Sequence, residues 1–553
     1  MSRSRTHSTF PFIVGGLLVL LVALYFLTHR PDASSPSSDS IARSASSAPD
    51  SPSADSALNL NPSPSSGSEA ADAATVADLA QKLSTRLNLP STRAHEAVLI
   101  FKNADGYRRF LARAAQSGVI VAGQIDALNI VRVRIRAYDT FAAELVARAA
   151  DYGGVSANTF VQIPPAPEPR ATGRQIAVGN QLLATLGIPA GTDTSAWGRG
   201  VTIAVLDGGA LPDPTLGARL RYLDIGLGYA GTGASGLHGT AVSALAAGSA
   251  ADAPGVAPAA TVLSIRVIDT DDKSDVFTVT QAIVAAVDAG AQLINLSLGG
   301  YSTSEALNRA IAYAAARDVV IVAAAGNDGA GRLTWPAADP RVVSVGATDA
   351  TGRLASFSNS GEQLRLTAPG VGLQTAALAN ERALFSGTSA SAPIVTGALA
   401  TLMSQTPGLT AAQAVEILQA HADDGGPAGP DANYGHGTLD LGWALARADA
   451  ARTDTAVSGE DYNPDTGVLS VIVQNRSARP STQLTLALDL NGRPSTIPIS
   501  ALAPGQSLAI PVPLDPATAT APIALRTRLE NAPGITDAVP ANNTRATRLE
   551  LPR

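Results

Sequence analysis

Four continuous apolar segments between residues 201 and 323 constrain the fold of this chain more than any other feature. They cover residues 201–206, 262–267, 293–296 and 319–323. A strand that is buried on both faces has such an uninterrupted apolar sequence, whereas a strand with one solvated face alternates apolar and polar residues. Ala-rich stretches of helical character separate the four segments. The pattern therefore predicts an α/β fold built on a doubly wound parallel sheet, which we place within residues 169–452.

Residues 91–168 show a second pattern, in which strands alternate with amphipathic helices. The clearest strand alternates valine and isoleucine with arginine over residues 131–136. The signals in chain order are a strand at 97–101, a helix at 107–114, strands near 119–121 and at 131–136, a helix at 141–149 and a strand at 159–163. This order predicts a small ferredoxin-like α+β domain.

The region after residue 453 has a third pattern, with alternating apolar residues and no helical spacing. Leucine occupies every second position from 484 to 490. The Asn491-Gly492 pair that follows is typical of a tight turn between two antiparallel strands. Residues 453–553 are therefore predicted to form a β-sandwich.

The first 30 residues have the pattern of a membrane anchor. Arg3 and Arg5 precede an uncharged apolar run from 10 to 27, about long enough to span a bilayer. Thr28-His29-Arg30 follows the run, instead of the small-residue site of a cleaved signal peptide. We expect a retained transmembrane anchor at residues 1–30, with the rest of the chain outside the cytoplasm, periplasmic or extracellular. Residues 31–90, rich in serine, alanine and proline, are expected to be a disordered linker.

The composition excludes several kinds of chemistry. The chain has no cysteine, which rules out disulfides, cysteine-ligated zinc and a cysteine nucleophile. Its 46 acidic and 39 basic residues give a net charge of -7, so no broad basic field is present to hold nucleic acid. We expect no nucleic-acid partner.

Four polar residues lie where reactive side chains are expected in a parallel sheet, at the carboxyl ends of strands or the starts of helices. Asp207 and Asn327 each follow one of the apolar strands. His238 is expected to open a helix of small residues, and Ser389 to lie at the start of another. Hydrolysis by a serine needs a general base, a carboxylate that orients the base, and donors for the oxyanion. The four residues supply each of these roles.

Each of the four also has a purely structural explanation when taken alone. An aspartate or asparagine after a strand is usually a turn residue, and a serine can simply cap a helix. A second His-Gly-Thr triplet at His436, together with Ser389 and Asp431, would give the chain order of an α/β-hydrolase. That class needs a Gly-x-Ser-x-Gly turn, which is absent around Ser389. We therefore interpret His436 as structural.

The four residues, in this order, resemble the subtilisin-like serine peptidases (subtilases, peptidase family S8), and the resemblance runs from about residue 197 to 447. Other motifs that carry it are Gly255-Val256-Ala257-Pro258, Ser297-Leu298-Gly299-Gly300, Ser356-Phe357-Ser358, Ala368-Pro369-Gly370 and Tyr434-Gly435-His436-Gly437. The resemblance implies a serine endopeptidase that acts through an acyl-enzyme intermediate. Asp207, His238 and Ser389 would be catalytic, and Asn327 would belong to the oxyanion hole. Ser297, Leu298 and Gly299 would bind an extended peptide substrate by β-pairing.

The sequence departs from the subtilase pattern without losing a catalytic group. Asp207 is followed by glycine at 208, where threonine or serine is usual, and the second histidine expected after His-Gly-Thr is Ala241. Residues 248–255 form a shorter segment than in subtilases that bind calcium there. Asp269, Asp271, Asp272 and Asp275 offer oxygen ligands for a structural calcium ion. We favour a solvated acidic loop and predict no metal site and no cofactor.

The flanking domains have resemblances of their own. Residues 91–168 resemble the inhibitor I9-like prodomain of the same family, which implies an intramolecular inhibitor. Residues 453–553 resemble bacterial adhesion-type immunoglobulin-like modules of the CARDB type, with either a binding or a spacer role. The expected partners are peptide or protein substrates, the chain's own prodomain and the membrane. Self-cleavage within 164–174 would release the peptidase. The competing hypothesis is a non-catalytic subtilisin-like scaffold that binds peptides, and the complete set of catalytic residues favours the enzyme.

Overall fold

The computed structural model describes residues 58–59, 80–165, 175–229, 231, 233–377, 381–463, 466–512, 514 and 522–549. The anchor predicted at residues 1–30 lies outside this part of the chain, as does most of the linker predicted at 31–90. No helix within the described residues is long and apolar enough to cross a membrane.

A nine-stranded sheet forms the core of residues 175–452, the region that contains the candidate catalytic residues and is called the catalytic region below. Its strands are β6 (Thr202–Asp207), β7 (Leu220–Leu223), β10 (Thr261–Arg266), β12 (Leu293–Leu296), β13 (Val320–Ala324), β14 (Val343–Thr348), β15 (Leu366–Pro369), β18 (Ala422–Asp423) and β19 (Thr438–Leu439). Their spatial order is β18-β19-β15-β14-β13-β12-β6-β10-β7. All neighbours are parallel except β18 and β19, which are antiparallel.

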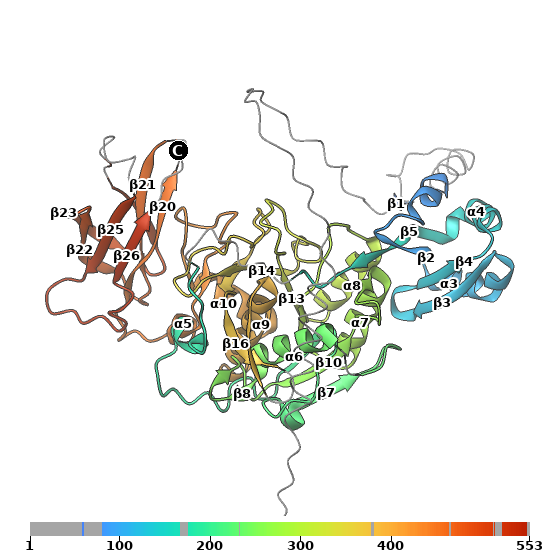
Figure 1. Cartoon of the computed structure of the whole chain (residues 1–553), viewed down its shortest axis with the longest axis horizontal. Helices are drawn as coiled ribbons and strands as arrows, with labels where there is room; N and C mark the ends of the chain where they lie inside the picture. The colour runs from blue at the N-terminus through green and yellow to red at the C-terminus, as the bar shows by residue number, and fades with distance from the viewer. Residues whose placement is uncertain are drawn as a thin grey trace, which may run out of the picture. The chain divides into compact units, whose positions relative to one another are not determined.

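Helices cover both faces of this sheet, as Figure 1 shows. They are α6 (Gly233–Ala247), α7 (Val276–Asp288), α8 (Glu305–Ala315) and α9 (Thr388–Gln405). Along β6, Ile203 and Val205 belong to the apolar cluster that contains α6 and α9. Ala204 and Leu206 belong to the cluster that contains α7 and α8. Both faces of the strand are thus buried, and the predicted doubly wound parallel sheet is confirmed.

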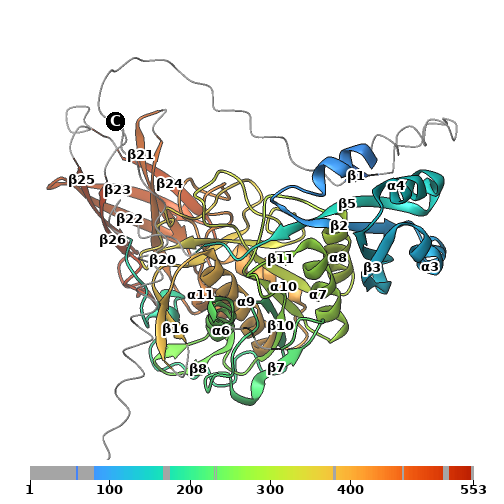
Figure 2. The same cartoon turned by 45° about the vertical axis from the view of Figure 1, so that its right-hand side comes forward.

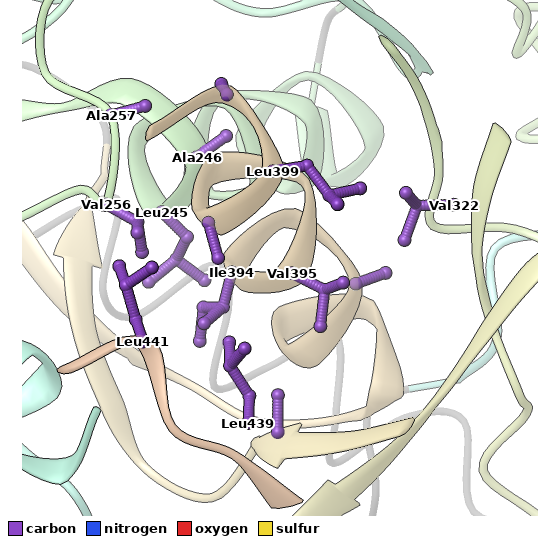
Figure 3. Packing of buried hydrophobic residues seen from close by; sticks show 14 of the residues in the cluster. Leu245, Ala246, Val256, Ala257, Val322, Ile394, Val395, Leu399, Leu439 and Leu441 are labelled. Atoms are coloured by element: carbon purple, nitrogen blue, oxygen red, sulfur yellow. The ribbon is translucent and has the colours of Figure 1, made fainter. Parts of the chain in front are cut away.

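Helix α9 lies inside the protein instead of on its surface. Its Ile394, Val395 and Leu399 are fully buried and pack against residues of α6 and of the sheet, including Leu245 and Val322 (Figure 3). A helix that is apolar on all sides is buried in a core. The same apolar cluster includes residues of three shorter helices, α5 (Leu182–Thr185), α10 (Ala411–Ala420) and α11 (Leu441–Ala446).

Residues 92–161 form an α+β unit around an antiparallel sheet. Its elements are β2 (Thr92–Phe101), α3 (Ala104–Arg113), β3 (Val119–Ile125), β4 (Ile130–Ile135), α4 (Tyr138–Ala147) and β5 (Tyr152–Val161). The strand order is β5-β2-β4-β3, with the short β1 (Leu58–Asn59) beside β5. The end of β5 also pairs with β11 (Ser274–Asp275) at the start of α7, and Figure 2 shows the two strands side by side.

The C-terminal residues form two antiparallel sheets that share one apolar core. One sheet contains β20 (Thr455–Asn463), β21 (Val468–Asn475) and β24 (Ser507–Val512), and the other contains β22 (Ser481–Leu490), β23 (Arg493–Leu502), β25 (Ile523–Glu530) and β26 (Thr544–Leu549). The predicted turn at Asn491-Gly492 joins β22 to β23, and both turn residues have positive φ angles, 53° and 81°. Two short antiparallel pairs complete the strands of the catalytic region: β8 (Ser249–Ala250) with β9 (Ala253–Pro254), and β16 (Leu373–Ala376) with β17 (Arg382–Phe385).

Candidate active site

Asp207 is the last residue of β6, a central strand whose carboxyl end reaches the edge of the sheet. Its side chain is almost fully buried, and the backbone N–H of Gly208 donates to its Oδ1 at 2.6 Å. A Cβ atom at position 208 would lie 2.0 Å from the carbonyl oxygen of Ser235. Glycine at 208 therefore lets the first turn of α6, which precedes His238, approach Asp207, and this explains the departure from the usual sequence.

His238 lies beside Asp207 on helix α6. Its Nδ1 is 2.8 Å from Asp207 Oδ1 and 3.0 Å from Oδ2. With Nδ1 donating to the carboxylate, Nε2 is the nitrogen that can accept a proton. The ring of Phe385 packs edge-on against the imidazole, with ring centroids 5.2 Å apart at 78°. These two contacts fix the plane of the imidazole.

The prediction that His238 opens its helix was wrong. Helix α6 begins at Gly233, so His238 lies in its second turn. The first residues, Gly-Ala-Ser-Gly, contain two glycines and have low intrinsic helix propensity. Ser235 and Gly236 are buried in the structure, so tertiary packing stabilises a helical turn that the sequence alone does not favour.

Ser389 is the second residue of α9, as predicted, with only 2% of its surface exposed. Its Oγ donates to the carbonyl oxygen of Ser297 at 3.3 Å. Pro393 lies inside this helix. Proline has no N–H, so the Ser389 carbonyl lacks its usual helical donor four residues later. Ser297 Oγ donates to that carbonyl instead, at 3.0 Å.

A buried polar network holds Ser297 in this position. Asn295 Nδ2 donates to Ser297 Oγ at 3.0 Å, and Thr396 Oγ1 on α9 donates to Asn295 Oδ1 at 3.1 Å. All three side chains are completely buried. Because buried polar groups are costly unless they are paired, this network specifies how β12 and α9 pack together. It therefore positions the edge at Ser297 relative to Ser389.

Asn327 follows β13, and its amide has a fixed orientation. Its Oδ1 accepts hydrogen bonds from Thr388 N at 2.9 Å and from Thr388 Oγ1 at 2.8 Å. The amide nitrogen is therefore directed elsewhere, and Nδ2 donates to the carbonyl oxygen of Pro165 at 3.4 Å. The role of Thr388 was not predicted. The only sequence signal for it is its place directly before Ser389.

The end of the N-terminal α+β unit lies along Ser297–Gly299 as an extended peptide. Gln162 N donates to Gly299 O at 3.0 Å, and Gly299 N donates to Gln162 O at 2.9 Å. On the other side of this peptide, Val161 and Phe160 pair with β11. The segment is thus a β-strand between two edges of the catalytic region. The side chain of Leu298 is fully buried, and the hydrogen bonds to the segment come from Gly299.

A cavity of about 500 Å³ opens beside these residues. His238, Asn327 and Ser389 line it, together with the peptide at 163–165 and the hairpin of β16 and β17. The three candidate side chains therefore face one common space that is large enough for part of a peptide.

The other candidates of the sequence lie elsewhere. Asp431 Oδ1 accepts from the backbone N–H groups of Asn433 and Tyr434, so it is a turn residue. Burial and the nearby Arg365 hold the pKa of His436 below its usual value. Asp269 and Asp275, considered above as calcium ligands, both pair with Arg93. No group of three histidine, aspartate or glutamate residues in the described part of the chain is arranged to hold a metal ion.

The chain is similar to known proteins over its catalytic region. The model of the subtilase family matches residues 198–437, a stretch that contains all four candidate residues. Subtilisin Savinase of Lederbergia lenta is 35% identical over 221 residues, which are 40% of this chain and 82% of that protein. A thermophilic serine proteinase of Bacillus sp. (strain AK1) is 40% identical over 171 residues, which are 30% of this chain and 43% of that protein.

Two further proteins extend the comparison. The minor extracellular protease Epr of Bacillus subtilis (strain 168) is 32% identical over 245 residues, 44% of this chain and 38% of that protein. Among solved structures, the epidermin leader peptide processing serine protease of Staphylococcus aureus has a TM-score of 0.52 at 23% identity. The match covers 64% of this chain and 97% of that structure, and it shows a shared fold.

Proposed function

Because the chain belongs to the subtilase family and is a serine endopeptidase, we propose that Asp207, His238 and Ser389 form its catalytic triad. The contact that carries this proposal is the pair of short distances from His238 Nδ1 to the Asp207 carboxylate. It leaves Nε2 as the acceptor for the Ser389 proton. In the mechanism, Ser389 Oγ attacks the peptide carbonyl carbon while His238 Nε2 takes its proton.

The later steps use the same groups. The tetrahedral intermediate collapses, the C–N bond breaks, and the imidazolium of His238 gives its proton to the leaving amine. Water then attacks the acyl-enzyme, with His238 again as the base, and the carboxylic acid leaves as Ser389 recovers its proton. The Asp207 carboxylate stabilises the imidazolium.

Asn327 is proposed to stabilise the charge that develops on the attacked oxygen. Thr388 holds the amide oxygen, which directs Nδ2 to a bound carbonyl such as that of Pro165. The backbone N–H of Ser389, near the start of α9, is the second proposed donor, because the first N–H groups of a helix have no partner within it. Donors that are fixed before the reaction stabilise an oxyanion most effectively.

The test is a comparison of the full chain with its Ser389→Ala variant. We expect the variant to keep its thermal unfolding midpoint and to lose peptide hydrolysis, because only the nucleophilic oxygen is removed. A fluorophosphonate reagent should label wild type at Ser389 and leave the variant unlabelled. Undiminished turnover by the variant would contradict the assignment. A wild type that binds peptides but hydrolyses none would favour the scaffold hypothesis.

The α+β unit at residues 91–168 is proposed to act as an intramolecular inhibitor. Its C-terminal segment lies along the edge at Ser297–Gly299 and beside the cavity, a site called the groove below. There the segment pairs with Gly299 and its Pro165 carbonyl reaches Asn327. Pro165 has no N–H that could donate to the Ser297 carbonyl, which accepts the hydroxyl of Ser389 instead. In this docked state the nucleophile is therefore bonded away from His238.

In the sequence, the α+β unit lies between the proposed membrane anchor and the peptidase. On sequence grounds we propose that residues 1–30 anchor the chain with its catalytic region outside the cytoplasm, and the name of the extracellular relative Epr agrees with that side. Cleavage within 164–174 would cut the covalent link between anchor and peptidase. Wild type and Ser389→Ala should then differ, with a shorter soluble form only in wild type. If both remain full length in the membrane fraction, the release model is wrong.

A further inference from the structure

Two glycines form the wall of the groove next to Asn327. Gly299 is on the edge that pairs with the bound segment, and Gly326 directly precedes Asn327 with a φ of +113° that disfavours other residues. A Cβ atom at 299 would lie 2.5 Å from Thr334 Oγ1, and one at 326 would lie 2.9 Å from Thr334 Cγ2. The side chain of Thr334 therefore lies between the two glycines and fills the space beside them.

This space adjoins the residue that carries the attacked carbonyl. The bound segment pairs with Gly299 through Gln162, and three residues later the Pro165 carbonyl meets Asn327. In an extended peptide, side chains stand above and below the plane of the backbone hydrogen bonds. One face of the segment is thus opposite the wall made by Gly299 and Gly326. A side chain on that face can enter the recess between the glycines only as far as Thr334 allows.

Thr334 cannot move aside. Only 5% of its surface is exposed. Its N–H donates to Ala325 O at 3.0 Å, and its Oγ1 is 3.3 Å from both Ala324 O and Ala325 O. The next residue, Trp335, exchanges two backbone hydrogen bonds with Gly300, of 2.7 and 3.0 Å. The backbone and the hydroxyl are both held, so the methyl group stays in the recess.

The back of the recess is closed by Asn359, which is completely buried. Its Oδ1 accepts from the N–H groups of Asp328 and Ala330, both at 3.0 Å. Its Nδ2 donates to Tyr301 Oη at 2.9 Å and lies 3.3 Å from Ala325 O. Moving Asn359 to admit a substrate side chain would break these hydrogen bonds and leave buried polar groups unpaired. The recess is therefore shallow and rigid.

The free volume of the groove lies in another direction. The 500 Å³ cavity extends from Ser389 and His238 toward Phe385 and the β16–β17 hairpin, and neither glycine lines it. A large side chain has room there but not at the glycine wall. The restriction thus applies to one substrate position.

From this arrangement we infer that Thr334 limits the enzyme to substrates with a small side chain, that of glycine, alanine or serine, on the residue that supplies the attacked carbonyl. The inference rests on the proposed function, because it assumes attack by Ser389 beside Asn327. In the docked segment the carbonyl at Asn327 belongs to Pro165, which is larger than these residues, whereas positions 166, 171 and 173 of the segment 164–174 hold alanine or glycine.

The inference is tested with the full chain and a series of peptide anilides that differ only in the residue before the anilide: glycine, alanine, serine, valine, leucine and phenylalanine. We expect kcat/KM for alanine to exceed that for leucine and phenylalanine by about tenfold or more, since a misfitting methylene group or larger costs at least that much in a rigid pocket. The ratio of two substrates does not depend on the fraction of active enzyme.

Three variants separate size from hydrogen bonding. Thr334→Gly opens the recess and should raise the phenylalanine-to-alanine ratio about tenfold or more. Thr334→Ser keeps the hydroxyl, removes only the methyl group and should give a smaller rise, which covers the case in which the glycine variant fails to fold. Thr334→Val keeps the size without the hydroxyl and should leave the ratio close to that of wild type.

The outcomes are distinct. A wild type that prefers phenylalanine or leucine, or a ratio that stays unchanged in both the glycine and the serine variants, overturns the role of Thr334 while the peptidase assignment stands. Hydrolysis of none of the anilides, together with no labelling of Ser389 by a fluorophosphonate even after the α+β unit has been removed by limited digestion, contradicts the proposed function itself and the inference with it.

Discussion

Asn327 illustrates how much of an active residue depends on neighbours that are distant in the sequence. Its amide could adopt either of two orientations related by a flip, and only the pair of donors on Thr388 selects the one that directs Nδ2 into the groove. Pro393 acts in a similar way, because its missing N–H leaves the Ser389 carbonyl to be bonded by Ser297. Both effects arise from α9, the helix that carries the proposed nucleophile Ser389.

Asn327→Ala should lower kcat about 10²- to 10³-fold with little change in KM, the loss typical of removing one oxyanion donor. Thr388→Val should lower kcat by a smaller factor, because the backbone N–H still holds Asn327 Oδ1 while the hydroxyl no longer does. Thr401→Val is the matched control, since this hydroxyl on the same helix bonds to Val256 O away from the site. Steady-state kinetics measures all three. An effect confined to KM would show that Asn327 only shapes the groove.

At the scale of elements, the most specific contacts join β2 of the α+β unit to the segment before α7. Arg93 pairs with Asp269 at 2.5 Å and with the fully buried Asp275. Asp275 also caps α7 by accepting from Thr278 N at 2.8 Å. Nearby, Asn158 Oδ1 accepts from Phe277 N in the first turn of the same helix. The unit therefore supplies an acceptor for an N–H group at the N-terminal end of α7, in addition to placing its C-terminal segment in the groove.

This contact predicts that acid loosens the α+β unit. Burial alone would raise the pKa of Asp269, but hydrogen bonds from Arg93 and from the N–H groups of Lys273 and Asp271 hold the pKa below its ordinary value. The docked form therefore binds a proton less readily than the undocked form. The stabilisation is fully present above the ordinary pKa, about 3.9, and is lost as the pH falls through the lower pKa of the docked form.

The effect is measured by pepsin digestion of the Ser389→Ala chain at a series of pH values from 5 to 3. The further substitutions are made in this chain, and digestion rates are compared between variants at the same pH. Cleavage of the α+β unit should accelerate as the pH falls. Asp269→Asn should be cleaved faster already at pH 5 and should show a smaller further change on acidification. Arg134→Met is the control, because Arg134 lies on the same sheet but pairs with Glu96 within the unit. Equal pH profiles for wild type and Asp269→Asn would contradict the prediction.

The elements differ in how far the sequence predicts them. The four apolar strands and the Asn491-Gly492 turn were predictable because each depends on local pattern. Strands β14 and β15 were not predicted, since Val343–Thr348 and Leu366–Pro369 mix small polar residues with apolar ones. Within the site, Asp207 and Ser389 lie at the predicted element ends. Thr334 and Phe385 have no local signal, because their importance comes from folding next to Gly299 and His238.

At the scale of the whole described chain, the C-terminal sheets are joined to the catalytic region through a buried charge cluster. Arg476, 5% exposed, lies 2.7 Å from Asp423 Oδ1 and 3.3 Å from Asp440 Oδ2, and its Nε donates to Gln474. Asp440 caps α11 through Trp443 N. Burial is the main reason why the pKa of Asp440 is raised, and the charge of Arg476 acts against it. One guanidinium thus compensates carboxylates from two elements of the catalytic region.

Arg476→Met should therefore destabilise the protein by roughly 3–5 kcal/mol, the usual cost of leaving buried charges without their partner. Arg479→Met, an exposed arginine a few residues away, should change stability by no more than about 0.5 kcal/mol. Urea unfolding of the full chain measures both. Equal midpoints for the two variants would mean that the cluster contributes no net stability.

The order of the segments along the chain has a consequence for a protein made from its N-terminus. The α+β unit leaves the ribosome first, its docking helices α7 and α8 next, and the groove edge at Ser297–Gly299 soon after. Ser389 follows about ninety residues later, and domains fold as units during synthesis, N-terminal ones first. The α+β unit can therefore fold before the proposed nucleophile has been translated, whereas the groove forms only once α9 has entered the core. The nascent polypeptide thus contains its proposed inhibitor before its peptidase site is complete.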